Sequence, residues 1–153
     1  MTSLCCDVLN ALKGKTLVTA ESLTGGGIGA ALTAISGSSA VYKGGIISYT
    51  NWVKENILGV PGELLETLGA VSGPVAEAMA VGARKKLQAD VAVSVTGLAG
   101  PGADEFGNSV GTVFIGYANE YESFSVKHHF TGDREAVRCQ TIRAALELVL
   151  DNV

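Results

Sequence analysis

The spacing of hydrophobic positions changes along the chain, and each change predicts a helix or a strand. Near the N-terminus, Thr2 or Ser3 can cap a helix whose apolar residues recur at helical spacing, namely Leu4, Val8, Leu9 and Leu12. Short apolar runs bounded by glycine or polar residues predict strands over residues 16–20, 44–49, 91–96, 110–118 and 123–130. The last two are separated by a few polar residues and are expected to form an antiparallel hairpin.

Helices are expected between these strands. One follows a polar turn and covers residues 26–35, and Thr50 or Asn51 can cap a short helix that ends near Leu58. Residues 63–68 predict another short helix, and Ser72 can cap a longer one with a proline in its first turn. A final amphipathic helix follows Thr131-Gly132-Asp133, with inward positions expected at Val137, Ala144, Ala145, Leu148 and Val149.

This order of elements predicts an α/β fold, since strands that alternate with helices form parallel sheets covered on both faces. We expect a three-layer α/β/α sandwich with a mixed, mainly parallel sheet. The chain has 153 residues, enough for one full hydrophobic core, and no repeat or low-complexity linker divides it. Residues 1–153 are therefore expected to form one domain.

Composition narrows the range of partners and locations. The net charge is −4 and Lys and Arg are not clustered, which argues against a nucleic acid or an anionic membrane as partner. No apolar segment approaches the ~20 residues of a membrane span, and residues 1–12 do not resemble a signal peptide. Three cysteines without zinc-type spacing suit a reducing compartment. We expect a cytoplasmic protein.

The strongest candidate chemistry lies where the first predicted strand ends. Glu21, Ser22 and Thr24 place three polar side chains in a turn, and Gly25 and Gly26 lead into the next helix. A helix N-terminus carries unpaired amides and about half a positive charge, so it stabilises an anion or a developing oxyanion. Ser22 therefore suits a nucleophile beside an oxyanion hole, and the alternative is a serine that merely caps the helix.

A serine nucleophile needs a base, and Lys54 is a better candidate than either histidine. His128 and His129 are neighbours on one strand, so their side chains point to opposite faces. Lys54 falls in the first turn of the helix after strand 44–49, and parallel pairing would bring it close to Ser22. A solvated surface lysine is the alternative.

Two effects are expected to lower the pKa of Lys54. The positive end of the helix dipole disfavours an extra proton, and burial against Trp52 or Ile57 would act in the same direction. A base at neutral pH needs a lysine pKa of about 7–8, so desolvation must supply most of the change. Tyr49 stands just before this helix and could relay a proton or orient Ser22, or simply pack on the core.

Two further segments suit ligand binding. The glycine-rich loop that begins with Thr96, Gly97 and Gly100 follows a buried strand and lets main-chain amides approach a ligand. Arg134, at the start of the last helix, could clamp a phosphate or a carboxylate. A dinucleotide fold is disfavoured, because the GxGxxA match at Gly25 lacks the acidic residue expected after the second strand.

Several motifs together resemble those of the CinA C-terminal domain family. They are Thr19-Ala20-Glu21-Ser22-Leu23-Thr24-Gly25-Gly26, Gly44-Gly45-Ile46-Ile47-Ser48-Tyr49-Thr50-Asn51 with Lys54, Val95-Thr96-Gly97-Leu98-Ala99-Gly100-Pro101-Gly102, and Gly132-Asp133-Arg134. The motifs occur in the right order and extend over nearly the whole chain. Leu23 departs from the pattern, since the family commonly has cysteine there, but the change leaves the serine in place.

The resemblance implies an amidohydrolase that converts nicotinamide mononucleotide and water to nicotinate mononucleotide and ammonia. It implies a Ser/Lys mechanism without metal or cofactor, with Ser22 as nucleophile, Lys54 as base and Tyr49 assisting. It also implies a homodimer, and substrate contacts from Glu21, Thr24, Gly25, Gly26, Thr96, Gly97, Gly100 and Arg134. The alternatives are a non-catalytic nucleotide-binding module of the same fold and, further off, a structural or interaction protein.

Overall fold

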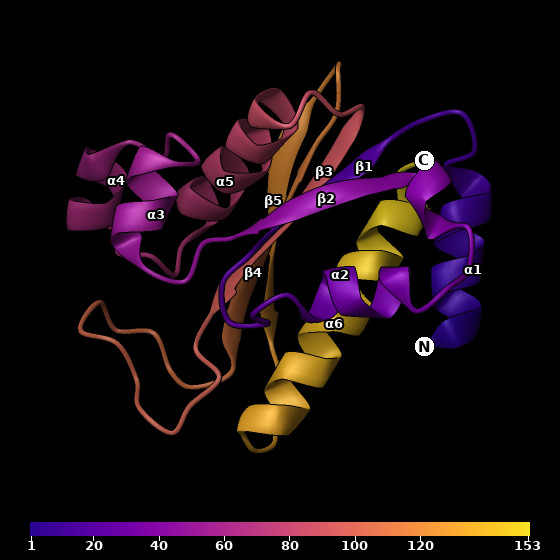
Figure 1. The fold of residues 1–153 in the computed structure, drawn as a ribbon. Coiled ribbons are helices and arrows are strands. Elements are labelled where there is room, and N and C mark those ends of the chain that lie inside the picture. Colours follow the sequence, from indigo (N-terminus) through magenta and orange to yellow (C-terminus); the bar gives the residue numbers. More distant parts are fainter.

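The computed structural model describes all of residues 1–153 and contains helices and strands in alternation (Figure 1). The strands are β1 (Leu17–Glu21), β2 (Tyr42–Ile47), β3 (Val91–Gly97), β4 (Thr112–Ala118) and β5 (Ser123–His129). The helices are α1 (Thr2–Ala11), α2 (Gly27–Thr33), α3 (Asn51–Asn56), α4 (Gly62–Thr67), α5 (Gly73–Lys86) and α6 (Arg134–Asp151), with a 3-10 turn at Ser38–Ala40.

The five strands form one mixed sheet in the order β2-β1-β3-β4-β5. β1 pairs in parallel with both β2 and β3, whereas β4 is antiparallel to β3 and to β5. Four strands therefore point the same way and only β4 runs in the opposite direction. The predicted α/β class, the mixed sheet and the β4–β5 hairpin are confirmed.

Each face of the sheet carries its own hydrophobic core, because successive residues of a strand point to opposite faces. Leu17 faces one side with α1, α2 and α6, and Val18 faces the other with α5. The α6 side is lined by large residues, among them Val93, Ile115, Tyr117, Val137 and Leu146. The three layers of the predicted sandwich are visible in Figure 1, where α5 and α6 lie on opposite faces of the sheet.

Small residues let α5 pack close to the sheet. Ser94 of β3 donates a hydrogen bond from its hydroxyl to the main-chain oxygen of Ala76 in α5. Gly116 of β4 lies against the same turn of the helix, and a Cβ there would overlap the oxygen of Ala76 and the hydroxyl of Ser94. Glycine at position 116 is therefore required by the close approach of helix and sheet.

The observed elements differ from the predicted ones mainly at their ends. The cap expected from Thr2 or Ser3 is wrong, because α1 already begins at Thr2 and Met1 caps it without a side-chain bond. Ser72 does cap α5, and its hydroxyl accepts a hydrogen bond from the amide of Val75. In α6, Val137, Ala145 and Val149 are buried as expected, together with Leu146, which the helical pattern did not include.

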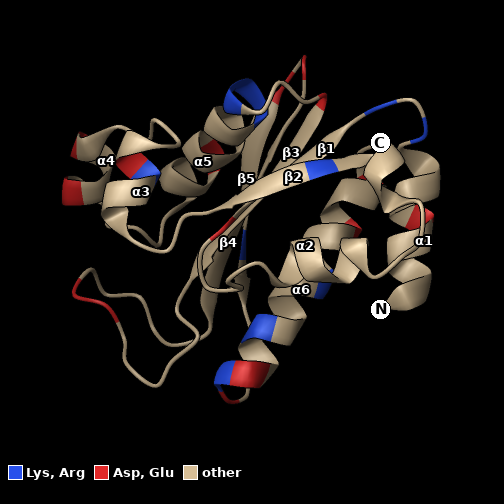
Figure 2. Ribbon diagram, in the orientation of Figure 1, with Lys and Arg blue, Asp and Glu red and all other residues tan.

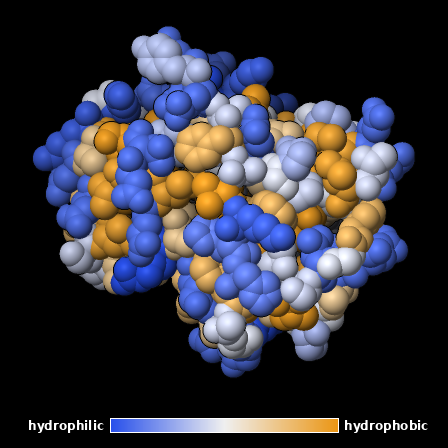
Figure 3. All heavy atoms as spheres, turned by 180° about the vertical axis from the view of Figure 1, so that it is seen from behind, coloured by the Kyte–Doolittle hydropathy of each residue, from blue (hydrophilic) through white to orange (hydrophobic).

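The surface mixes charge signs and polarity. Figure 2 shows Lys and Arg spread over several elements, and the one run of three, residues 84–86, lies at the end of α5, where cations favour the carbonyl end of a helix. Seen from behind, hydrophobic residues form small groups among hydrophilic ones (Figure 3). None of the helices combines the length and the apolar character needed to cross a bilayer.

Substitution of Gly116 tests the close packing of α5. We expect Gly116→Ala to lower the free energy of unfolding by about 2 kcal/mol, because the added methyl group overpacks a contact with main-chain atoms that cannot move aside. Gly102→Ala is the matched control, since a Cβ at Gly102 meets no atom within 4 Å. Urea unfolding of both variants measures the difference, and equal stability of the two would contradict the packing argument.

Candidate active site

The site lies beyond the carboxyl ends of the three parallel strands, where ligands bind in open α/β sheets. Ser22 directly follows β1, and its amide donates to the oxygen of Val95 in β3 at 3.1 Å. On the other side, the amide of Ser48 donates to the oxygen of Glu21 at 2.7 Å. The sheet hydrogen bonds thus continue one residue past the strands and fix the backbone at Ser22.

Lys54 reaches this point from α3, as the parallel pairing of β1 and β2 predicts. Its Nζ donates to Ser22 Oγ at 3.0 Å and to the main-chain oxygens of Ser48 at 2.7 Å and Tyr49 at 3.4 Å. Both side chains are buried, with exposed fractions of 1% for Lys54 and 7% for Ser22. The amine is therefore enclosed by three oxygen atoms, and none of them belongs to a carboxylate.

Burial lowers the pKa of the Lys54 amine from 10.5 to about 8. Desolvation is the cause, because the charged form loses its water and gains no negative charge in exchange. Burial, which the sequence analysis expected to supply most of the change, is thus confirmed as the cause. The expected dipole effect is wrong, because Lys54 is the fourth residue of a six-residue helix, and the side chains expected to bury it, Trp52 and Ile57, are 65% and 37% exposed.

Glu21 occupies the N-terminus of α2, which the sequence had assigned to an anion. Its carboxylate accepts hydrogen bonds from the hydroxyl of Thr24 at 2.6 Å and from the amides of Ile28 at 2.8 Å and Gly29 at 3.0 Å. Glu21 is 2% exposed and does not line the cavity described below. The structure thus gives Glu21 and Thr24 the task of shaping the turn, instead of the predicted contact with a ligand.

Among the amides of Gly25, Gly26 and Gly27, only that of Gly26 donates no hydrogen bond. The amides of Gly25 and Gly27 donate to the oxygens of Ser22 and Thr24 at 3.1 and 2.9 Å. Gly25 and Gly26 have φ of +58° and +102°, which closes the turn, and neither borders the cavity. The amides of Leu23 and Thr24 also donate no hydrogen bond. Of these two residues only Leu23 borders the cavity, so its amide is the donor directly after Ser22 that is free to stabilise negative charge.

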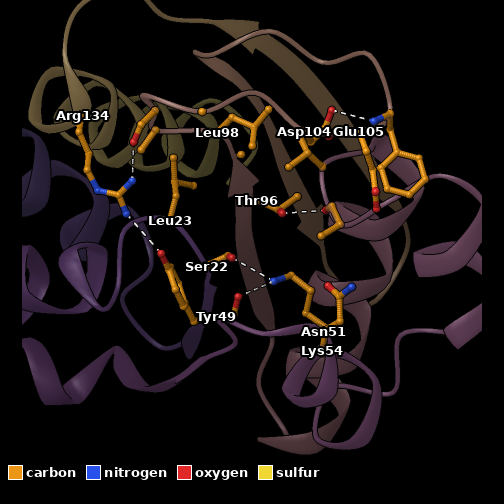
Figure 4. Close-up of a pocket in the computed structure, with 17 residues that line it drawn as sticks. Ser22, Leu23, Tyr49, Asn51, Lys54, Thr96, Leu98, Asp104, Glu105 and Arg134 are labelled. Atoms are coloured by element: carbon orange, nitrogen blue, oxygen red, sulfur yellow. Dashed lines mark hydrogen bonds between the residues drawn. The ribbon is translucent and has the colours of Figure 1, made fainter.

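A cavity of about 660 Å³ opens beside Ser22 and Lys54, within the usual range of small-ligand pockets. Figure 4 shows the Ser22–Lys54 contact between two ends of this cavity, with Arg134 and Tyr49 at one end and Asp104 and Glu105 at the other. The walls are mostly uncharged main chain and apolar side chains, including Leu23, Ala70, Val71, Gly97, Leu98, Ala99, Gly100, Gly102 and Phe106.

Arg134 joins the glycine loop to Tyr49 at the mouth of the cavity. Its Nη1 donates to the oxygen of Gly100 at 2.7 Å and its Nη2 to the phenol oxygen of Tyr49 at 3.3 Å. The Tyr49 side chain is 60% exposed, so its phenol faces Arg134 rather than Ser22, and only its carbonyl touches the lysine. The expected role of the Tyr49 phenol in orienting Ser22 therefore finds no contact in the structure.

Thr96 and Gly97 line the cavity as predicted, and each also anchors the site to its surroundings. The hydroxyl of Thr96 donates to the oxygen of Ala70 at 2.8 Å. A Cβ at Gly97 would overlap β4, so only glycine lets β3 continue into the loop there. Farther along, Asn108 donates from its side-chain amide to the oxygen of Val71 at 3.1 Å and so docks the loop.

Arg138 was missed by sequence reasoning. From α6, its Nε donates to the oxygen of Leu23 at 2.9 Å and its Nη2 to the oxygen of Thr24 at 3.2 Å. It follows Arg134 by four residues, which places both on one face of the helix. This spacing in the sequence was the signal that could have identified Arg138. No group of three or more His, Cys, Asp or Glu side chains is arranged to hold a metal ion.

The fold and the site define a class of protein, namely a three-layer α/β domain that buries a serine–lysine pair beside a glycine-lined cavity. A family model, the CinA C-terminal domain, matches residues 2–153. The chain belongs to this family. The family resemblance inferred from the sequence motifs is thereby confirmed.

Curated relatives extend this comparison. A nicotinamide-nucleotide amidohydrolase PncC of Pseudomonas putida is 46% identical over 134 residues, which cover 88% of this chain and 84% of the relative. A CinA-like protein of Parasynechococcus marenigrum is 49% identical over 137 residues. Those residues are 88% of this chain but 32% of the relative, so the chain spans about a third of the length of such CinA-like proteins.

Solved structures match the whole fold. The competence damage-inducible protein A of Klebsiella pneumoniae superposes with a TM-score of 0.96 at 34% identity, covering 99% of this chain and 95% of that one. The competence/damage inducible protein of Agrobacterium tumefaciens has a TM-score of 0.94 at 38% identity, covering 98% and 93%. The predicted three-layer architecture is therefore that of experimentally determined relatives.

The low pKa of Lys54 predicts a dependence of stability on pH. The unfolded chain keeps the lysine proton up to pH 10.5, whereas the folded chain loses it near 8, so the wild type gains stability as pH rises between these values. At ~1.36 kcal/mol per pH unit the gain is about 3 kcal/mol. Lys54→Met removes the titrating group and should remove this gain.

Urea unfolding at pH 7 and pH 10 measures the effect as a difference between variant and wild type. We expect the stability of Lys54→Met relative to wild type to fall by about 3 kcal/mol from pH 7 to pH 10. Lys13→Met is the control, because Lys13 is exposed and should show no such change. A Lys54 variant that follows the control would show that the amine keeps an ordinary pKa.

Proposed function

We propose that this chain hydrolyses the carboxamide of nicotinamide mononucleotide, giving nicotinate mononucleotide and ammonia, with Ser22 and Lys54 as the catalytic pair. The observation that carries the proposal is the 3.0 Å contact between a buried lysine amine and a buried serine hydroxyl at the wall of a ligand-sized cavity. The name of the Pseudomonas putida relative, which this chain matches over most of its length, supports the choice of amide.

The surroundings of Lys54 suit a general base. A neutral amine has two hydrogens and one lone pair, and the oxygens of Ser48 and Tyr49 can accept both hydrogens. The lone pair is then directed at the Ser22 hydroxyl, from which it takes the proton as Oγ attacks the amide carbon. With a pKa of about 8, a useful fraction of the amine is neutral near pH 7.

The rest of the reaction uses the same groups. Attack converts the amide oxygen to an oxyanion, which the free amide of Leu23 is available to stabilise. The protonated Lys54 then gives its proton to the amide nitrogen, which leaves as ammonia when the C–N bond breaks. Lys54 next takes a proton from water as the water oxygen attacks the Ser22 ester, and returns it to Ser22 Oγ when the ester C–O bond breaks. The acid so released loses its own proton to solvent and leaves as the carboxylate.

The charges around the cavity suggest how the nucleotide lies. Arg134 donates two of its N–H groups to Gly100 and Tyr49, and the guanidinium has three more that can bind a phosphate. The amides of Ala99, Gly100 and Gly102 donate no hydrogen bond in the chain and lie on the same loop. Asp104 and Glu105 at the opposite end would repel a phosphate. The phosphate is therefore assigned to the Arg134 end.

Ammonia release by the purified protein tests the proposal. We expect turnover of nicotinamide mononucleotide by the wild type and at least a 10³-fold loss in Ser22→Ala, because removal of the nucleophile leaves only binding and the oxyanion donors. Ser36→Ala, at an exposed serine, is the control and should keep wild-type rates. Nicotinamide and its riboside, which lack the phosphate, should be poorer substrates. Undiminished turnover by Ser22→Ala would exclude it as the nucleophile.

The same experiment separates catalysis from the alternative of a nucleotide-binding module. A module would bind nicotinamide mononucleotide in a calorimeter and yield no product by chromatography. The buried lysine favours catalysis, because enclosing an amine without a counterion is costly and a binding site gains nothing from it.

The dependence of kcat/KM on pH tests the role of Lys54, because this ratio reports the pKa of the free enzyme. Since the reaction needs the neutral amine, log kcat/KM should rise with a slope of one at low pH and level off above an apparent pKa near 8. Lys54→Met should lose this titration together with most of its activity. A profile that is flat between pH 6 and pH 10 in the wild type would contradict a lysine base.

A further inference from the structure

We infer that Arg138 is a positioning residue that holds the oxyanion donor of the turn after Ser22, the amide of Leu23. This inference rests on the proposed function, and it assigns a role to a side chain that neither borders the cavity nor touches Ser22 or Lys54. Its basis is the direction of two peptide groups, which the guanidinium fixes from outside the site.

The carbonyl groups of the turn are all engaged. The oxygen of Ser22 accepts from the amide of Gly25, and the oxygen of Thr24 accepts from the amide of Gly27. Arg138 supplies the donor for the oxygen of Leu23 and a second one for Thr24. Without Arg138, the Leu23 oxygen would have no hydrogen-bond donor in the protein, so nothing else fixes the plane of the Leu23–Thr24 peptide.

The direction of each carbonyl sets the direction of the amide behind it. A trans peptide is planar, so its N–H points opposite to its C=O. Arg138 Nη2 and the Gly27 amide both donate to the oxygen of Thr24, so the N–H of that peptide, which belongs to Gly25, is held toward the oxygen of Ser22. The bond from Gly25 to the Ser22 oxygen in turn directs the Leu23 amide out of the turn. Leu23 borders the cavity, and its amide donates no hydrogen bond.

The turn is held from two sides. Glu21 fixes it from the β1 end, through the Thr24 hydroxyl and two amides of α2, and Arg138 fixes it from α6. A buried amide without a partner costs about 1–3 kcal/mol, so a turn that was free to move would rotate the Leu23 amide toward another acceptor. Glu21 and Arg138 prevent this rotation and keep the Leu23 amide available for the developing oxyanion.

Arg138→Lys tests the role, because lysine keeps the charge and most of the side chain but lacks the planar fork that reaches two carbonyl oxygens at once. We expect kcat for nicotinamide mononucleotide to fall by about 10²-fold, the usual loss of one oxyanion donor, with KM changed by less than about threefold. The apparent pKa of the kcat/KM profile should stay near 8, because Arg138 does not touch Lys54.

Arg143→Lys is the matched control. Arg143 lies on the same helix, is 55% exposed and pairs only with Glu147, so this variant should keep the wild-type kcat. Thermal melting of both variants reports folding. A wild-type kcat in Arg138→Lys, or a loss confined to KM, would overturn the inference.

An aldehyde probe reads out the oxyanion donors without relying on turnover. Ser22 Oγ adds to the carbonyl carbon of pyridine-3-carboxaldehyde, Lys54 takes the serine proton, and the aldehyde oxygen becomes the alkoxide of a hemiacetal. We expect Arg138→Lys to weaken inhibition by the aldehyde about tenfold or more and to leave binding of nicotinate mononucleotide within threefold. Equal loss for both ligands would mean that Arg138 serves folding alone.

The probe also separates the two proposals. If the wild type binds the aldehyde at Ser22 and releases no ammonia from nicotinamide mononucleotide, the proposed substrate is wrong while the role of Arg138 is still measured. If the wild type releases ammonia and Arg138→Lys keeps full aldehyde affinity, the proposed function holds and the positioning role fails.

Discussion

The structure depends on the burial of one lysine amine against one serine hydroxyl. The amine of Lys54 meets three oxygens and no carboxylate, so its charged form is solvated poorly and its pKa falls to about 8. An ion pair at this place would have raised the pKa and kept the lysine protonated, so that it could not accept a proton near neutral pH. The chemistry proposed for the site therefore follows from the atoms that surround the amine. The arrangement of α3, β2 and the end of β1 brings these atoms together.

A second constraint concerns the main chain around Ser22. Parallel pairing of β1 with β2 and β3 brings the ends of three strands to one edge, and hydrogen bonds from Ser48 and to Val95 extend that order to the serine. The turn that follows is then fixed by Glu21 and Arg138, which use charge to hold peptide groups instead of a ligand. Both charged residues therefore hold the backbone close to Ser22 in place.

The sequence was a good guide to the fold and to the contact between Ser22 and Lys54, for local reasons. Apolar runs of strand length and the caps at Thr50 and Ser72 depend on neighbouring residues, so they could be predicted, and the order of helices and strands along the chain followed from them. The proximity of Ser22 and Lys54 followed from parallel pairing alone. The sequence could not indicate that Trp52 would face solvent, that Glu21 would cap α2, or that Arg138 would reach the turn, because each depends on packing between distant segments.

Two of the three oxygens around Lys54 are main-chain carbonyls, those of Ser48 and Tyr49. A carbonyl persists whatever side chain its residue bears, so mutation at these two positions would leave the acceptors in place as long as the backbone keeps its path. The surroundings that lower the pKa of the amine are therefore set by the backbone path between β2 and α3 rather than by the side chains of Ser48 and Tyr49. Evolution could then vary the rim of the cavity, and with it the choice of substrate, while the proton-transfer chemistry stays intact.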